Sequence, residues 1–306
     1  MEKYDVIIIG LGAAGASAGI YARRFGLRTL IIGKEPGGQA NDASEIENYP
    51  GVFKVSGFEL MQKFREQAKA LGAEIMLAEA TDVSKRGRAF RVKTASKEYE
   101  GKAVIFATGS RKRRLGVPGE QELLGKGVSY CATCDGPFFK GKTVCVIGGG
   151  DSAVCSAVLL AEHAKKVYMI YRKEKKDMRT APYCLHRAEA SKNVEMIFRT
   201  YPVKINGRDR VESVAFKRDG RDVEFRVDGV FVEIGTEPQN ELAKKLGVSL
   251  TEQGRINVAN NMATNVAGIF AAGDVTSGSG DFEQVVTAAA EGAIAARSAY
   301  KYVKKS

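Results

Sequence analysis

Two apolar segments that run directly into glycine-rich turns constrain the fold of this chain more than any other feature. Residues 4–9 are apolar and β-branched, and they are followed by Gly10-Leu11-Gly12-Ala13-Ala14-Gly15, an alanine-rich stretch to about residue 25, and a second apolar run at 29–32. In such a strand–turn–helix–strand unit the glycines allow a tight turn, close approach to a pyrophosphate and close helix packing. The helix N-terminus then faces the phosphates. The pattern predicts a dinucleotide-binding unit.

The same design occurs a second time. Residues 143–147 form another apolar run, followed by Gly148-Gly149-Gly150-Asp151-Ser152-Ala153. In an alignment of the two turns, Gly10, Gly12 and Gly15 correspond to Gly148, Gly150 and Ala153. A chain of 306 residues is long enough for about two domains of roughly 150 residues each. We therefore expect an α/β protein with two dinucleotide-binding (Rossmann-like) three-layer domains.

Two short segments indicate that the second domain is inserted into the first. The composition of residues 110–119 shifts to Arg111-Lys112-Arg113-Arg114 and Pro118, and residues 233–238 have the composition of a return linker. We expect residues 1–110 and 239–306 to form the first domain and residues 111–238 the second. The basic run is either a solvated hinge or a phosphate site.

A pair of cysteines near the entrance of the second domain carries the candidate chemistry. Cys131-Ala132-Thr133-Cys134-Asp135 separates two thiols by two residues, a spacing typical of thiol–disulfide exchange. The chain has five cysteines, an odd number without the framework of a small disulfide-stapled domain. A redox or metal role is therefore favoured.

A zinc site on this pair would need two further ligands. Cys145 and Cys155 are expected to pack in a strand and a helix, and Cys184 lies in a region that the pattern does not assign. The only histidines are His163 and His186. Because no second cysteine pair accompanies the first, we expect no metal.

The net charge of +11 raises the question of a nucleic-acid partner. The basic residues are spread through the chain, and no zinc-finger, ribonucleoprotein or helix-turn-helix signature accompanies them. A basic surface also steers acidic proteins and phosphate-bearing cofactors. The N-terminal apolar run is too short to cross a membrane and ends at Gly10. We expect a cytoplasmic protein without nucleic-acid or membrane partners.

The residues after the second strand of each unit distinguish the nucleotides. An acid normally binds the adenosine ribose there. The first unit has Gly33 instead, with Glu35 nearby, and the second has Tyr171 followed by Arg172 and Lys173. Cations without an acid favour a 2′-phosphate, so the second unit is expected to take NADPH. Near the C-terminus, an apolar strand ends at Asp274, where a carboxylate can hold a ligand hydroxyl.

Taken together, the motifs resemble those of the low-molecular-weight thioredoxin reductases, over nearly the whole chain. The motifs that carry the resemblance occur in the family's order: Gly10-x-Gly12, Gly37-Gly38-Gln39, Glu47-Asn48-Tyr49-Pro50-Gly51, Ala107-Thr108-Gly109, Cys131-Ala132-Thr133-Cys134-Asp135, Gly148-Gly149-Gly150 and Ala272-Gly273-Asp274. The cysteine motif between the two nucleotide turns is highly specific.

The resemblance implies FAD in the first domain, NADPH in the second, a homodimer, and reduction of thioredoxin or a similar small dithiol protein. It implies that Cys134 faces the flavin, Cys131 attacks the substrate disulfide and Asp135 protonates the departing thiolate. The residues expected to bind FAD are Gly10, Gly12, Ala14, Gly15, Glu35, Gly38, Gln39, Asn48, Thr108, Gly109, Gly273, Asp274, Gln284 and Val285. Those expected to bind NADPH are Gly148, Gly150, Asp151, Ser152, Arg172, Lys173 and Arg179.

The disulfide and the nicotinamide site both belong to the inserted domain, and both must reach the one flavin. The domain is therefore expected to rotate about its two linkers between half-reactions.

Two positions depart from the family pattern. The family reads His-Arg-Arg followed by a further Arg, whereas this chain has Tyr171-Arg172-Lys173 and two extra residues before Arg179. Near the final helix the chain has Glu283-Gln284 where the family has Arg-Gln. These departures keep open a donor other than a nicotinamide, either a reduced deazaflavin or ferredoxin.

A non-catalytic flavin redox sensor is a further alternative. A ferredoxin–NADP reductase of similar architecture is disfavoured, because it should lack the cysteine pair.

Overall fold

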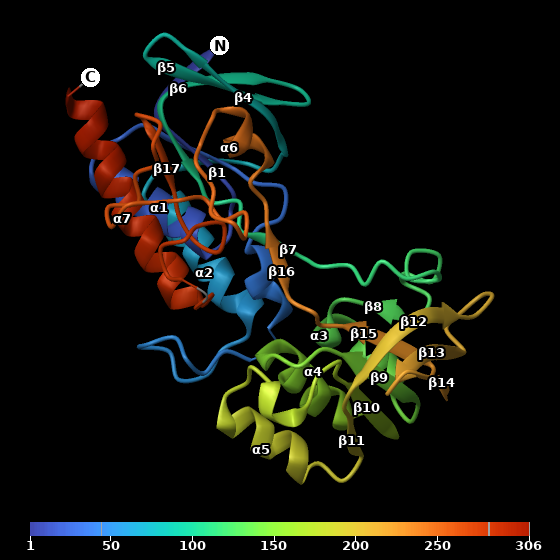
Figure 1. Ribbon diagram of the computed structural model, residues 1–306. Helices are drawn as coiled ribbons and strands as arrows, with labels where there is room; N and C mark the ends of the chain where they lie inside the picture. The colour runs from blue at the N-terminus through green and yellow to red at the C-terminus, as the bar shows by residue number, and fades with distance from the viewer. Residues whose placement is uncertain (44, 281, 306) are drawn as a thin grey trace. The chain divides into compact units, whose positions relative to one another are not determined.

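The computed structural model describes residues 1–43, 45–280 and 282–305 (Figure 1). The chain forms two compact units. Unit 1 consists of residues 1–111 and 237–306, and unit 2 consists of residues 112–236. Unit 2 is therefore an insertion in the chain of unit 1.

Unit 1 contains a seven-stranded sheet, with one antiparallel hairpin added to a parallel core. The order is β3-β2-β1-β6-β5-β4, and β17 also pairs with β6. The strands are β1 (Glu2–Ile9), β2 (Thr29–Ile32), β3 (Glu74–Met76), β4 (Ala80–Arg86), β5 (Ala89–Thr94), β6 (Glu98–Phe106) and β17 (Ile269–Ala271). In the register Ile9 lies beside both Ile32 and Phe106, so three parallel strands end at the same edge of the sheet. This edge carries the first glycine turn.

Three long helices accompany this sheet: α1 (Ala13–Arg24), α2 (Gly57–Ala70) and α7 (Val285–Lys305). The sequence determines the start of α2 locally, because Ser56 and Glu59 form a reciprocal capping box. Helices α1 and α7 cross closely because Gly292 has no side chain, and a Cβ there would lie 2.2 Å from the Ala14 oxygen. Short helices complete the unit: the 3₁₀ helix η1 (Gly38–Asp42) and α6 (Glu241–Lys245).

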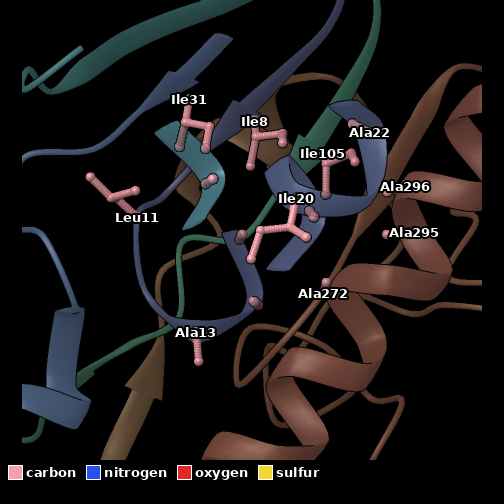
Figure 2. Close-up of a cluster of buried hydrophobic side chains, with 14 of the residues drawn as sticks. Ile8, Leu11, Ala13, Ile20, Ala22, Ile31, Ile105, Ala272, Ala295 and Ala296 are labelled. Atoms are coloured by element: carbon pink, nitrogen blue, oxygen red, sulfur yellow. The ribbon is translucent and has the colours of Figure 1, made fainter. Parts of the chain in front are cut away.

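The apolar contacts between sheet and helices form the core of unit 1 (Figure 2). Ile8, Ile31 and Ile105 come from three neighbouring parallel strands, while Ile20 and Ala295 come from helices α1 and α7. All five are buried. The alanine-rich sequence of both helices allows them to pack closely against the β-branched surface of the sheet.

Unit 2 repeats the plan on a smaller scale. Its five-stranded parallel sheet has the order β11-β10-β9-β15-β8, with a separate three-stranded sheet β12-β13-β14. The strands are β8 (Val128–Ser129), β9 (Thr143–Ile147), β10 (Lys166–Ile170), β11 (Val194–Ile197), β12 (Thr200–Asn206), β13 (Ser213–Arg218), β14 (Arg221–Arg226) and β15 (Gly229–Val232). The helices are α3 (Ala132–Asp135), α4 (Asp151–Ala161) and α5 (Pro182–Ala190), with 3₁₀ turns η2 (Gly136–Phe139) and η3 (Lys175–Asp177).

The two crossings of the chain pair as a small sheet of β7 (Ser110–Lys112) and β16 (Thr236–Pro238). The Arg111 guanidinium donates to Glu237 and Glu241 at 2.7 and 2.8 Å, and Lys112 Nζ donates to Glu233 at 3.0 Å. The first two cations of the basic run are therefore ion-paired at a crossing between the units, and they are not available to a phosphate.

The polar first half of strand β6, from Glu98, pairs with β1 and β5. Within the described part of the chain, no helix combines the length and the apolar character needed to cross a membrane.

Candidate functional site

The cysteine pair forms a disulfide in unit 2. Cys131 and Cys134 are bonded, with Cα atoms 5.3 Å apart. Cys131 is the N-cap of α3, and the Cys134 amide donates a hydrogen bond to the Cys131 Sγ at 3.1 Å. Asp135 follows in the same turn and is half-buried.

The three glycines of the first turn have different surroundings. Gly10 has φ +115°, and a Cβ there would lie 1.9 Å from the Ala107 oxygen, so no other residue fits. A Cβ on Gly15 would lie 2.0 Å from the Gly10 oxygen. Around Gly12 the nearest atom to such a Cβ is the Gly37 oxygen at 3.7 Å. Gly10 and Gly15 are therefore required by the fold, whereas Gly12 leaves open space.

That open space lies at the N-terminus of α1, where no side chain caps the helix. Its first N–H groups are therefore available to an anion. Gly38, with φ +56°, approaches Gly12, and the Gly37 amide donates to the Leu11 oxygen at 2.8 Å. The fold thus brings two glycine motifs, 26 residues apart between Gly12 and Gly38 in the sequence, to one cradle. An uncapped, open cradle of this kind fits a dinucleotide pyrophosphate.

Other residues expected at the first nucleotide gather in the same unit. Gln39 Nε2 donates to the Ser110 carbonyl and hydroxyl, both at 2.7 Å. Asn48 Nδ2 donates to Gln284 Oε1 at 2.9 Å, joining two motifs from opposite ends of the chain. Thr108 donates to the Gln239 carbonyl at 2.6 Å, and Gly109 has φ +63°.

Two further residues expected at this nucleotide occupy less constrained positions. Glu35 is exposed, and its carbonyl accepts from the Gly38 amide at 3.3 Å. Val285 is the first residue of α7.

Asp274 follows β17 and lies in a polar pocket. Burial raises the pKa of its carboxyl to about 6, and the nearby charge of Glu283 adds to this. The preceding Gly273 amide donates to Glu291, a buried acid of α7, at 2.8 Å. Thr276 donates to the same carboxylate at 2.8 Å. Glu291 thus positions the turn that carries Asp274. The sequence did not indicate this role, because Glu291 lies among alanines and glycine in α7.

Arg255 is a second residue that the sequence analysis missed. Its guanidinium forms an ion pair with Glu283 and donates to the Asp274 and Thr276 carbonyls at 3.3 and 3.4 Å. A carboxylate beside a cofactor phosphate is electrostatically unfavourable by itself. Here the charge of Glu283 is compensated by Arg255, which lies 28 residues earlier in the sequence. Glu283 therefore does not weigh against a phosphate-bearing ligand as its sequence position suggested.

The second glycine turn is built like the first. Gly148 has φ +154°, and a Cβ there would lie 2.0 Å from the Glu233 oxygen. Helix α4 has Gly150 as N-cap without a side-chain cap, and Ser152 in its first turn is exposed. Asp151 accepts a hydrogen bond from the Ala181 amide at 2.7 Å. This turn also fits a nucleotide phosphate.

The segment after β10 folds back onto this turn. The Tyr171 ring packs against Gly149, where a Cβ would lie 2.2 Å from it, and the Arg179 amide donates to the Gly149 carbonyl at 3.0 Å. Despite the two extra residues, Arg179 is thus brought to the glycine turn. The side chains of Arg172, Lys173 and Arg179 are exposed.

The structure brings together two of the remaining cysteines, which the sequence did not indicate. Cys145 is buried in β9, as expected. Cys155 and Cys184, which stand singly in the sequence, lie together, with their Sγ atoms 3.6 Å apart. The sequence could not show this, because the pair depends on the packing of α5 against α4.

A redox-active disulfide in a chain with two dinucleotide-type units defines the class: an oxidoreductase that moves electrons between a nucleotide cofactor and a disulfide. Comparison with known families agrees. The pattern of the pyridine nucleotide-disulphide oxidoreductases matches residues 4–292. The thioredoxin reductase of Bacillus subtilis (strain 168) is 42% identical, over 99% of this chain and 95% of its own length. That of Treponema pallidum (strain Nichols) is 43% identical, over 98% and 97%.

Solved structures show the same relationship. Thioredoxin reductase from Lactococcus lactis (FR conformation) has a TM-score of 0.95 and 38% identity, with 99% of this chain and 100% of that chain covered. A ferredoxin-flavin thioredoxin reductase from Clostridium acetobutylicum has a TM-score of 0.55 and 33% identity, with 100% of both chains covered.

The chain belongs to the pyridine nucleotide-disulphide oxidoreductase family, and within it to the low-molecular-weight thioredoxin reductases. It is therefore an oxidoreductase that acts on sulfur groups, with a flavin and a nicotinamide as the cofactor types of its family and a thioredoxin-type protein as its class of substrate.

Proposed function

We propose that this chain is a thioredoxin-disulfide reductase in which electrons pass from NADPH to FAD, to the Cys131–Cys134 disulfide, and on to a thioredoxin-like protein. The observation that carries the proposal is the Cys131–Cys134 disulfide in a chain that also has two uncapped dinucleotide turns. Relatives named thioredoxin reductase, 41–43% identical over nearly the whole chain, support it.

The two cysteines have different tasks in this proposal. The reduced Cys131, whose sulfur accepts the Cys134 amide, attacks the partner's disulfide and forms a mixed disulfide. Cys134 then attacks Cys131 Sγ, which releases the partner as a dithiol and restores the Cys131–Cys134 disulfide. Asp135 protonates the departing thiolate. Cys134 is assigned to the contact with the flavin.

The first nucleotide is assigned to unit 1, with residues 1–110 and 239–306 as its domain. The cradle of Gly12 and Gly38 and the bare N-terminus of α1 hold a pyrophosphate, and Asp274 accepts from a ribityl hydroxyl. FAD, when bound, supplies the two-electron step between nicotinamide and disulfide.

NADPH is assigned to unit 2, with residues 111–238 as its domain. Gly148 and Gly150 accommodate the pyrophosphate, and Arg172, Lys173 and Arg179 recognise the 2′-phosphate. The alternative is a donor other than a nicotinamide. The feature that favours this alternative is the Tyr171 ring, which packs against Gly149 and occupies space beside the glycine turn. The Clostridium acetobutylicum relative is named a ferredoxin-flavin thioredoxin reductase, which supports ferredoxin as the alternative donor.

An anaerobic titration of the flavin-loaded protein with NADPH separates the two donors. Prompt bleaching of the flavin absorbance, followed by reduction of added thioredoxin, is expected. A flavin that bleaches with dithionite but not with NADPH or NADH contradicts the nicotinamide assignment and directs the search to deazaflavins and ferredoxins.

Single cysteine variants test the order of attack. In Cys134→Ser, the mixed disulfide between Cys131 and thioredoxin should accumulate, because no second thiol resolves it; non-reducing electrophoresis detects it. Cys131→Ser should trap no partner. The reverse result reverses the two roles.

Because the disulfide and the nicotinamide belong to the same inserted domain, unit 2 is proposed to rotate about its two crossings between half-reactions. A short bifunctional cross-linker that joins the two units should abolish NADPH turnover, whereas a monofunctional reagent of the same chemistry should not. Unchanged turnover in the cross-linked enzyme would exclude the rotation.

We also propose a homodimer, which light scattering at several concentrations tests. A cytoplasmic location remains a prediction.

A further inference from the structure

Cys155 and Cys184 form a thiol pair that the proposed function does not use. Cys155 lies on α4 and is exposed, and Cys184 lies on α5 and is half-buried. The Cys155 thiol donates to the Cys184 sulfur, with 3.6 Å between the two Sγ atoms. A disulfide needs about 2.05 Å, so an approach of about 1.5 Å joins them. Rotation of two side chains can supply a movement of this size.

The pair adjoins the second nucleotide turn. Helix α4 starts directly after Gly150, and α5 starts at the end of residues 172–181, which we call the flap. The flap is tied to its surroundings by three groups: Arg179 donates to Gly149 at 3.0 Å, Ala181 donates to Asp151 at 2.7 Å, and Lys175 pairs with Glu189 of α5. The flap and α5 are therefore linked to each other, and they contact the glycine turn and α4.

We propose that Cys155 and Cys184 are a second redox-active pair, whose reversible disulfide fastens α5 and the flap to α4 beside the nucleotide turn. The pair would take small-molecule or protein disulfides as its oxidants. The inference goes beyond the proposed function, because it requires neither turnover nor the Cys131–Cys134 pair.

The exchange step starts at Cys184. Its sulfur accepts the hydrogen bond, whereas the Cys155 thiol holds the proton that it donates. The Cys184 thiolate attacks the oxidant and forms a mixed disulfide, releasing one thiol. Cys155 then attacks Cys184 Sγ, and its proton goes to the second leaving thiolate. Two thiols of this chain are oxidised, and one external disulfide becomes two thiols.

Thiol counting on the full-length protein tests the chemistry. With Cys131 and Cys134 bonded, three thiols remain, those of Cys145, Cys155 and Cys184. Oxidised glutathione should reduce the count after denaturation from three to one. Dithiothreitol should then raise it to five, because it also reduces the Cys131–Cys134 disulfide. Peptide mapping should find Cys155 linked to Cys184. Cys145→Ser is the matched control and should still lose two thiols.

Three results would overturn the chemistry: an unchanged count, glutathione adducts on both cysteines without an internal link, or a link between two chains. Peptide mapping of the unaltered protein distinguishes them, so the answer does not depend on whether a variant folds.

Amide hydrogen exchange tests the fastening. Residues 172–190 should exchange at least several-fold more slowly after oxidation, because a disulfide limits local opening of the flap and α5. Cys184→Ser treated in the same way should show no such slowing. If the internal disulfide forms and exchange in this segment is unchanged, the flap is not fastened and that half of the proposal fails.

Discussion

At the scale of single residues, the two nucleotide turns separate positions required by the fold from positions left open for a ligand. Gly10 and Gly12 are two residues apart. A Cβ added to Gly10 would clash with backbone atoms, whereas a Cβ added to Gly12 would meet none closely. The difference can be measured, because an added methyl group at each position should have a different effect.

Gly12→Ala should fold normally and bind FAD at least about tenfold more weakly, because its methyl group fills the pyrophosphate cradle. Gly10→Ala should instead lose about 3 kcal/mol of folding free energy, since it forces a positive φ and a backbone clash. Denaturant unfolding of the apoproteins and flavin-binding titration measure the two effects. Equal loss of stability in both variants would contradict this division of roles.

Asp274 should make the apoprotein less stable as the pH rises. Its pKa is raised from 3.8 to about 6 in the folded state, so the unfolded chain releases the proton first. The stabilisation is complete below pH 4 and is lost as the pH rises through 6, by about 3 kcal/mol. The side chains that face this carboxyl include Glu283, Glu291 and Arg255.

Asp274→Asn should remove this part of the pH dependence in denaturant unfolding between pH 4 and 8. Asp209→Asn, at an exposed position, is the control and should leave it unchanged. A wild-type profile equal to that of Asp274→Asn would show that the carboxyl does not titrate in this range.

At the scale of elements, the contact of α1 with α7 positions the first nucleotide turn. Ala14 lies in the first turn of α1 and touches both Gly273 and Gly292, so a single residue connects the glycine turn, the end of β17 and α7. The close crossing keeps Gly273 next to the first turn of α1.

Gly292→Ala should force α7 away from α1, since its Cβ would lie 2.2 Å from the Ala14 oxygen. We expect a loss of roughly 1–3 kcal/mol, typical of overpacking, together with weaker flavin binding. Ala290→Ser, on the exposed side of the same helix, should change neither property by a comparable amount. Thermal unfolding and flavin titration provide the comparison, and a stabilised Gly292→Ala would disprove the close-packing argument.

At the scale of the whole molecule, the net charge of +11 should govern the encounter with the protein partner. A basic enzyme attracts an acidic thioredoxin electrostatically, and dissolved salt screens this long-range attraction. The KM for an acidic thioredoxin should therefore rise, by roughly tenfold, between low salt and about 0.3 M salt. Reduction of a small neutral disulfide is the control. An equal salt effect on both substrates would locate the sensitivity in the enzyme rather than in the encounter.

Much of the molecule could be predicted from the sequence, because the decisive requirements are local. A tight turn needs Gly10, a pyrophosphate needs a bare backbone such as Gly12, and reversible disulfide chemistry needs Cys131 and Cys134 at short spacing. The insertion of one α/β unit into the other follows equally from the repeated strand–glycine–helix pattern and the two linkers. These features depend on neighbours within a few residues.

What only the tertiary structure decided are the pairings between distant segments. Arg255 compensates Glu283, Gln39 meets Ser110, and Cys155 meets Cys184, across 28, 71 and 29 residues respectively. No periodicity encodes such pairs, because they depend on the packing of whole helices and strands. The sequence by itself thus determined the class of fold and the spacing of the Cys131–Cys134 pair, while tertiary packing decided which charges are compensated and which further thiols lie close together.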